Sequence, residues 1–304
     1  MTLQTKAVLL HANFSIPAGR KVDKDISDKI ADDYSVTGGR AQSGNFNKMA
    51  IALSYFRPFM ATKREVENKI KSIALPYLHD NDKMYILPNV KIMDFAKVWR
   101  KATSDWDSSI NELRLGKYKE ALDEARKRLN DNGGMFRESD YTDVERFIGK
   151  FKMEKFMRPI PDVHSMGFLT SLSELEAQGI RKEVESSINE SMQASVQSLY
   201  NKIRDEMNGL IFILDKASPR IRESRLDGLT HLIRIMGDLN FTGDSRLNDI
   251  QRYMKEHLLF VPASLRGNEH AQQKAISHAE VVLKMLGSDE ETYKAMEKLY
   301  GFGS

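Results

Sequence analysis

The sequence predicts a mostly α-helical protein of the α+β kind, with a small N-terminal β-element and a multi-helix bundle around a long central helix. Three observations predict this fold class. Apolar residues recur at helical spacing, without a proline, through the stretch 172–214. Shorter stretches with the same spacing lie on both sides of it. Alternating apolar residues near the N-terminus, and two apolar runs bordered by proline, are typical of strands.

The β-element is predicted from two places in the first third of the chain. Residues 6–16 alternate between apolar and polar side chains until the turn Pro17–Gly19. Two apolar runs within residues 75–88 flank the polar segment His79–Asp82, and each is bordered by a proline, which indicates a β-hairpin. The hairpin and the first strand together would form a three-stranded sheet, about the minimum for stability.

Helical patterns fill most of the chain between these strands. Residues 21–45 are polar and predict a loop around one short helix near Asp25–Asp33. A helix is then predicted from Phe46 to Ile73, with a kink or break at Pro58, because proline lacks the backbone N–H.

A longer helical pattern follows the hairpin, from Ile92 to Leu129. Gly116 is a weak point within it, and Asn132–Gly134 is a stop signal. Trp99 and Trp106 lie seven residues apart on one face. We interpret this pair as core residues and not as a stacking platform for bases.

The segment before the central helix has the least regular pattern. One helix is predicted over residues 141–156, after which the run Arg158–Pro161 prevents regular structure. We place the domain junction there. Residues 1–158 form an N-terminal subdomain with the small sheet and two or three long helices, and residues 159–304 form a C-terminal helical subdomain.

The long helix that leads the C-terminal subdomain covers residues 172–214. At ~1.5 Å rise per residue its striped part is about 52 Å long, so other helices must cover it. Steps of four residues turn the stripe by about 40° each, which predicts different neighbours at its two ends and a globular bundle. Its apolar residues are Ile180, Val184, Ile188, Met192, Val196, Leu199, Ile203, Met207, Leu210 and Leu214.

Four shorter helices are predicted after Pro219, which ends the long helix. The last of them begins with the capping-box pattern Ser288–Glu291. Their expected ranges are 221–237, 245–259, 268–286 and 288–301.

Composition excludes several classes of function. The chain has 46 basic and 43 acidic residues and no cysteine. The net charge of +3 creates no field that would imply a polyanion partner, and disulfides, cysteine-ligated zinc and thiol catalysis are excluded within this chain. The apolar runs are far shorter than a membrane span, and a signal-peptide pattern is lacking. We therefore expect a cytoplasmic protein without a membrane partner.

Residues that would carry catalysis or hold a cofactor are not evident in the pattern. The seven histidines are scattered, and His270 and His278 lie two helical turns apart, too far to bind one metal ion. Acidic residues interleave with basic ones at helical spacing, which is typical of a solvated face. We expect no catalytic residue, no metal and no cofactor.

One stretch indicates a binding surface. Its basic residues alternate with Phe151 and Phe156, as in surfaces that bind nucleic acid or an acidic partner. The alternative is an amphipathic helix whose Phe and Met side chains face the core. A smaller basic site follows the first turn. The candidate residues of the two stretches are Lys150, Lys152, Lys155, Arg158, Arg20 and Lys21.

The chain resembles a family of uncharacterised phage and prophage proteins known as a domain of unknown function. Three stretches carry the resemblance: Phe14–Lys21, the hairpin of residues 75–88 with the tryptophan-bearing helix after it, and the long helix leading into Pro219–Leu229. Members of that family are often encoded beside a cobalt-chelatase-like AAA+ ATPase and a von Willebrand-type protein. The resemblance implies a partner or substrate adaptor of a remodelling ATPase, and it assigns no residue roles.

These observations lead to two functional hypotheses. The first is a non-enzymatic, phage-type protein of the bacterial host cytoplasm that binds a protein partner through helical surfaces and self-assembles. The second is a nucleic-acid-binding protein of phage replication or recombination that uses the stretch Lys150–Arg158. An enzyme has no residue constellation behind it.

Overall fold

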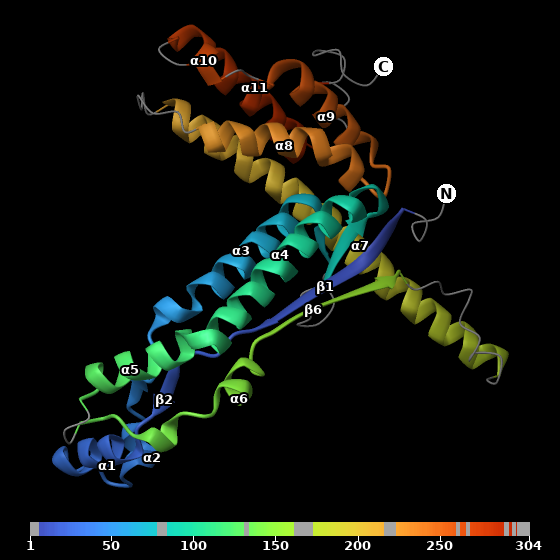
Figure 1. The fold of residues 1–304 in the computed structure, drawn as a ribbon. Coiled ribbons are helices and arrows are strands. Elements are labelled where there is room, and N and C mark those ends of the chain that lie inside the picture. Colours follow the sequence, from blue (N-terminus) through green and yellow to red (C-terminus); the bar gives the residue numbers. More distant parts are fainter. Residues whose placement is uncertain are drawn as a thin grey trace. The chain divides into compact units, whose positions relative to one another are not determined.

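The computed structural model describes residues 6–77, 84–130, 134–160, 173–215, 223–259, 262–265 and 268–288, with residues 292, 293 and 296. These residues are mostly α-helical, with a small antiparallel sheet and a long helix, as the sequence predicts (Figure 1). They divide into two compact units. We call the first the spine unit, and it consists of the described parts of Met1–His11, Ile70–Met93 and Met157–Ser304. We call the second the aromatic unit, and it consists of the described parts of Ala12–Lys69 and Asp94–Phe156.

This division differs from a single junction near residue 158. The chain passes near that point from one unit to the other, but the hairpin segment Ile70–Met93 belongs with the C-terminal helices. The reason is packing. Leu75 and Tyr77 join the same buried cluster as the long helix, and Ser195 Oγ of that helix donates a hydrogen bond to the Pro76 carbonyl at 2.6 Å.

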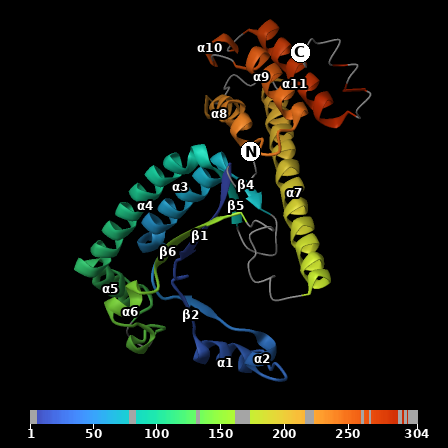
Figure 2. The ribbon, with the colours of Figure 1, turned by 90° about the vertical axis from the view of Figure 1, so that its right-hand side faces the viewer.

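The long helix of the spine unit is α7, Glu174–Asp215, a continuous run of 42 residues (Figure 2). A capping box that the sequence analysis missed starts it: the Ser173 N–H donates to the Glu176 carboxylate at 3.1 Å, and the Glu176 N–H donates to Ser173 Oγ at 3.4 Å. The predicted stripe is buried at Met192 and from Leu199 to Leu214, whereas its residues Ile180, Val184, Ile188 and Val196 are only partly buried.

Three further elements of the spine unit pack against α7. They are strand β4 (Leu75–Tyr77) and the helices α8 (Glu223–Leu239) and α11 (Glu269–Gly287). Helix α9 (Ser245–His257) packs against α8 and α11. The expectation of a bundle around the stripe is confirmed for these helices.

Two details of the C-terminal region differ from the prediction. A short helix α10 (Pro262–Leu265) precedes α11 and was not predicted. The predicted helix from Ser288 to Gly301 lies largely outside the described residues.

Asp244 and Asn268 cap α9 and α11, because their side chains accept the backbone N–H three residues on.

The sheet has four strands where the sequence predicts three. Its order is β4, then β5 (Met84–Pro88), β1 (Ala7–Ser15) and β6 (Lys152–Pro159). The predicted hairpin is confirmed: β4 and β5 pair antiparallel, and β5 pairs with β1 from Ala7 opposite Pro88. The turn His79–Asp82 lies outside the described residues.

Strand β6 corrects the prediction of a helix over residues 141–156. Only α6 (Val144–Ile148) is helical there, and the chain then extends along β1. The run Met153, Lys155, Met157 alternates with period two, which suits a strand. Its partner β1 lies far away in the sequence, so local spacing alone gave the wrong element.

The aromatic unit begins with elements that were expected to be a loop and a helix start. Its β2 and β3 form a two-stranded antiparallel sheet, so the predicted helix start at Phe46 is wrong. Helix α3 begins at Arg57, with Pro58 in its first turn, where a missing N–H breaks no helical bond. The elements are β2 (Arg20–Val22), α1 (Lys24–Asp33), α2 (Arg40–Ser43), β3 (Asn47–Met49), η2 (Leu53–Phe56) and α3 (Arg57–Ile73).

The second half of this unit follows the predicted long helix, with an interruption. The regular helix stops at η4, where Gly116 leaves the helical backbone conformation, as its weak position predicts. The helix end after Leu129 is confirmed, although residues 131–133 lie outside the described residues. The elements are α4 (Ile92–Glu112), η4 (Leu113–Lys117), α5 (Tyr118–Arg128) and η5 (Glu138–Asp140), and η3 (Asn89–Lys91), just before α4, belongs to the spine unit.

An aromatic cluster forms the core of this unit. Trp99 and Trp106 are buried, which confirms their interpretation as core residues. The ring of Phe59 lies 4.9 Å from that of Trp106, edge to face, and 4.3 Å from that of Phe151. Such pairs contribute about 0.5–1.5 kcal/mol each beyond the burial of their area.

Leu199 tests the packing of α7. Its side chain is fully buried at 0% exposure, whereas Leu175 on the same helix is 82% exposed. We expect Leu199→Ala to lower the free energy of unfolding by about 2–5 kcal/mol, because it removes apolar contacts and leaves a cavity. Leu175→Ala should change it by less than about 0.5 kcal/mol. Urea denaturation measures both, and equal effects would contradict the assigned position of α7.

His278 makes the spine unit sensitive to pH. Its ring stacks on His257 at 4.4 Å, and its Nδ1 accepts a hydrogen bond from the Tyr253 hydroxyl at 2.8 Å. Burial, and then the neighbouring His257 and Lys274, lower the pKa of His278 below its ordinary value of 6.5. The stability from neutral His278 is therefore present above that value and is lost as the pH falls below it.

We expect the thermal midpoint of the native protein to fall between pH 7 and pH 5, and His278→Gln to reduce this fall, because glutamine does not titrate. Differential scanning calorimetry at the two pH values measures it. His270→Gln, an exposed position on the same helix, is the control. An unchanged pH dependence in His278→Gln would count against this arrangement.

Candidate functional site

Two lysines face each other in the small sheet of the aromatic unit. Strands β2 and β3 pair with Arg20 opposite Met49 and Lys21 opposite Lys48. Like charges directly opposite each other on neighbouring strands repel. Asp140 compensates for this pair, because its Oδ1 lies 3.0 Å from Lys21 Nζ and its Oδ2 lies 2.7 Å from Lys48 Nζ.

Lys48 is the most deeply buried of these charges, with a side chain that is only 2% exposed. Its ammonium donates hydrogen bonds to Asp23 Oδ2 at 2.7 Å and to the Met135 carbonyl at 2.5 Å. Its contact with Asp140 Oδ2 is an ion pair outside regular hydrogen-bond geometry. Three protein oxygens thus lie around the ammonium, and two of them accept hydrogen bonds from it. Burial lowers the pKa of Lys48, but the two carboxylates outweigh it and hold the pKa above its ordinary value.

Asp23 connects this lysine to helix α1. Its Oδ1 caps the helix by accepting the Ile26 N–H at 3.3 Å, and its own N–H donates to the Phe46 carbonyl at 2.9 Å. Burial raises the pKa of Asp23, but the hydrogen bonds from Lys48 and the Ile26 N–H, with the charges of Lys48 and Arg137, together outweigh burial and hold the pKa below its ordinary value. Arg137 pairs with Asp25 at the same helix start. We call Asp23, Lys48 and Asp140 the lysine clamp.

The lysine clamp positions a basic cavity of about 320 Å³ in the same unit. Three segments line the cavity with charged groups: β2 supplies Arg20 and Lys21, η5 supplies Asp140, and the end of α6 leads to Lys150. The remaining lining is Pro17, Ala18, Gly19, Ala50, Ile51, Tyr118, Tyr141, Thr142 and Phe147. The structure therefore brings together three basic residues that the sequence analysis singled out in two separate stretches.

Gly19 allows β2 to reach this position. It has φ +65°, and its carbonyl accepts the Ile51 N–H at 3.0 Å. A Cβ at this position would lie 2.6 Å from a ring carbon of Phe56 and 2.7 Å from the Ile51 carbonyl oxygen. Only glycine combines this left-handed backbone with so close an approach.

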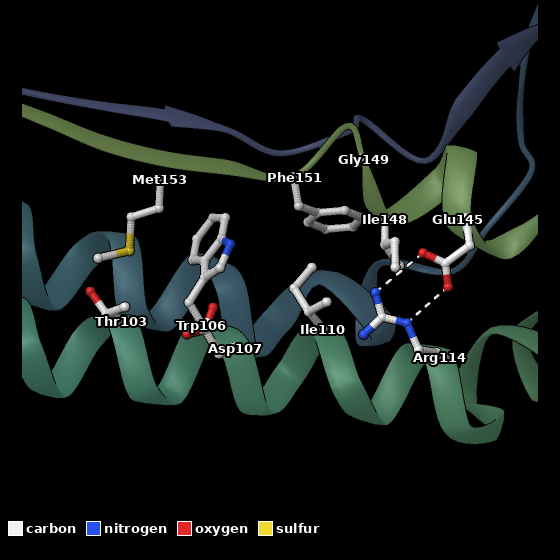
Figure 3. A pocket seen from close by; sticks show the side chains of 10 residues that line it. All are labelled: Thr103, Trp106, Asp107, Ile110, Arg114, Glu145, Ile148, Gly149, Phe151 and Met153. Carbon is white, nitrogen blue, oxygen red and sulfur yellow. Dashed lines mark hydrogen bonds and ion pairs between the residues drawn. The ribbon is translucent and has the colours of Figure 1, made fainter.

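A second hollow, of about 430 Å³, lies along α4 in this unit (Figure 3). Its walls include both apolar and polar side chains, with Trp106 and Phe151 among the apolar ones. Arg114 and Glu145 close one end with two parallel hydrogen bonds, Nε to Oε1 at 2.8 Å and Nη2 to Oε2 at 3.2 Å. Because these two charges pair with each other, neither is unmatched as Arg20 and Lys150 are in the basic cavity.

The other candidate residues lie on β6 and point to opposite sides of it. Lys155 is exposed, but its ammonium lies over two buried rings, 5.7 Å from the Phe95 ring centre and 5.4 Å from that of Trp99. Burial lowers the pKa of Lys155. Lys152 and Arg158 fall on the opposite face, because side chains alternate along a strand. The alternative of an amphipathic helix is wrong for residues 152–159, because they form this strand, whereas the binding surface stays a prediction.

Sequence reasoning missed Asp23, Lys48 and Asp140 as partners. Asp23 carries one local signal, since an aspartate before a helical run is a common cap. Lys48 lay inside a wrongly predicted helix, and its two carboxylates stand 25 and 92 positions away in the sequence. Only the folded backbone brings these three groups together.

Comparison with protein-family models, with curated proteins and with solved structures found no match for this chain. In the described part of the chain, no helix is both long and apolar enough to cross a bilayer. No group of three or more His, Asp or Glu side chains within the same residues is placed to hold a metal ion.

Lys48→Met tests the lysine clamp. Methionine preserves the volume but leaves Asp23 and Asp140 buried without their cation, so we expect a loss of about 3–5 kcal/mol in the free energy of unfolding. Lys101→Met is the matched control, because Lys101 pairs with Glu65 at the same 2.7 Å but on the exposed surface. It should cost far less than Lys48→Met, because an exposed ion pair contributes little to stability. Chemical denaturation compares the two, and a loss of similar size in both would refute the assigned role of Lys48.

Proposed function

We propose that this protein is a non-enzymatic interaction protein that binds an extended, acidic segment of a protein partner along strand β6. The exposed edge of β6 is the observation that carries the proposal. This strand is the last in the sheet order, and every residue from Lys152 to Pro159 except Met153 is exposed. Among them, the apolar residue Phe156 is 48% exposed.

An edge strand has main-chain N–H and C=O groups that can pair with another strand. The charges on β6 favour one kind of partner. Lys152, Lys155 and Arg158 outnumber Glu154, so two copies of this strand repel each other while an acidic segment is attracted. The self-assembly expected from the sequence would therefore use a surface other than β6.

The resemblance described above supplies a class of partner. It implies an AAA+ remodelling ATPase, for which this protein would act as a partner or substrate adaptor in a phage-encoded system of the bacterial cytoplasm. A non-enzymatic role is consistent with the lysine clamp, because the buried ammonium of Lys48 makes two hydrogen bonds to protein oxygens and an ion pair with Asp140. A group held in this way stabilises the fold and is not available as a base or nucleophile.

Binding of single-stranded nucleic acid is the second candidate. Lys152, Glu154, Phe156 and Arg158 share one face of β6. An aromatic ring beside cations is a common arrangement for stacking bases beside phosphates, although Glu154 opposes a polyanion. The two candidates differ in how they use the strand. A peptide pairs with the main chain of β6, whereas nucleic acid contacts its side chains.

A charge-reversal experiment separates the candidates. The probe is an extended peptide of about ten residues alternating Glu and Val, matched to the length of a strand. We expect it to bind the native protein and to slow hydrogen exchange of the β6 amides. Lys152→Glu with Arg158→Glu should weaken binding about tenfold or more, because two attractive charges become repulsive.

Lys119→Glu with Lys127→Glu, two exposed lysines of α5, is the matched control and should bind as the native protein does. Peptide binding without protection of the β6 amides would contradict strand addition. Binding of a single-stranded oligonucleotide but not of the peptide, with a steep dependence on salt, would favour the second candidate.

A further inference from the structure

We propose that the basic cavity of the aromatic unit binds a phosphate monoester, a small phosphorylated molecule of about the size of a nucleotide. This site is separate from the β6 edge and does not depend on the function proposed for it. The argument uses the charges around the cavity, its walls and its size.

Positive charges outnumber negative charges around the cavity. Lys48 and Lys21 are matched by Asp23 and Asp140 at distances of 2.7–3.0 Å. Arg20 and Lys150 also line the cavity, and neither makes an ion pair with any residue that the structure describes. Two positive charges therefore remain for a ligand. A phosphate monoester carries close to two negative charges at neutral pH and balances them.

Asp140 is the one carboxylate in the cavity lining, and it does not oppose an anion. Both of its oxygens are already engaged, Oδ1 with Lys21 and Oδ2 with Lys48. Burial raises the pKa of Asp140, but these lysines outweigh burial and lower it below the ordinary value. Asp140 is thus ionised at neutral pH, and Lys21 and Lys48 compensate its negative charge.

The two tyrosines form fixed, neutral walls. The Tyr118 hydroxyl donates to the Thr142 carbonyl at 2.5 Å, and the Tyr141 hydroxyl donates to the Ala50 carbonyl at 3.1 Å. Burial raises the pKa of Tyr141 to about 12, and burial also raises that of Tyr118, so neither ring becomes an anion at neutral pH. Because both hydroxyl hydrogens are used within the protein, the charged donors of the lining that have no carboxylate partner among the described residues are those of Arg20 and Lys150.

These features select a phosphate group over other anions. The guanidinium of Arg20 can hold two phosphate oxygens at once, and Lys150 adds a point charge from a different segment. The volume of about 320 Å³ exceeds that of inorganic phosphate and leaves room for an organic group against Ile51 and Phe147. Long nucleic acid would need cations along an open groove, whereas these cations surround one hollow.

Calorimetric titration of the full chain tests the proposal, with inorganic phosphate and adenosine monophosphate as probes and sodium chloride at equal ionic strength as the reference. We expect saturable binding of one phosphate or nucleotide per chain, with the nucleotide bound more tightly. Arg20→Gln with Lys150→Gln should weaken both by about tenfold or more, because two charge-assisted contacts are lost.

Arg20→Lys with Lys150→Arg keeps the charges and should retain most of the affinity, which separates loss of charge from misfolding. Lys152→Gln with Arg158→Gln on β6 is the matched control and should bind phosphate as the native protein does. No saturable binding above chloride, an equal loss in the β6 control, or binding of single-stranded DNA alone would each overturn the proposal. If the peptide does not bind at β6 but phosphate binding is intact, the proposed function is wrong and the phosphate proposal still holds.

Discussion

The ammonium group of Lys48 is surrounded by Asp23, Asp140 and the Met135 carbonyl in the interior of the aromatic unit. Removing these charges from water costs several kcal/mol per ion, and their attraction offsets the cost only when every polar atom has a partner. The net stabilisation by the intact cluster is therefore modest. Its larger effect is on geometry, since any arrangement that separates one member leaves a buried, uncompensated charge.

This constraint accounts for the arrangement of three chain segments that have few apolar residues of their own. The clamp holds the pair β2–β3, the start of α1 and the segment before Tyr141 in one fixed relation. Lys21 and Asp140 are members of that network and also line the basic cavity. Arg20 stands beside Lys21 on β2, so the network that stabilises the unit also positions one of its two unmatched cations, whereas Lys150 lies after α6.

How much could be predicted from the sequence depends on the range of the interaction. The spacing of Leu199, Ile203 and Met207 is a local property of a helix, and α7 was predicted with nearly correct ends. Strand β6 pairs with β1, more than a hundred positions away, and its short apolar run was read as a helix. Lys48 looked like any lysine of a polar face, because the partners that bury its charge are brought to it only by folding.

A double-mutant cycle between Lys48 and Asp140 measures this coupling most directly. The four proteins are the native chain, Lys48→Met, Asp140→Asn and the double variant, compared by their free energies of unfolding. If the buried ion pair organises the unit, the two substitutions are not additive and their interaction energy is about 2 kcal/mol or more. An interaction energy below about 0.5 kcal/mol, the range of independent sites, would contradict the account.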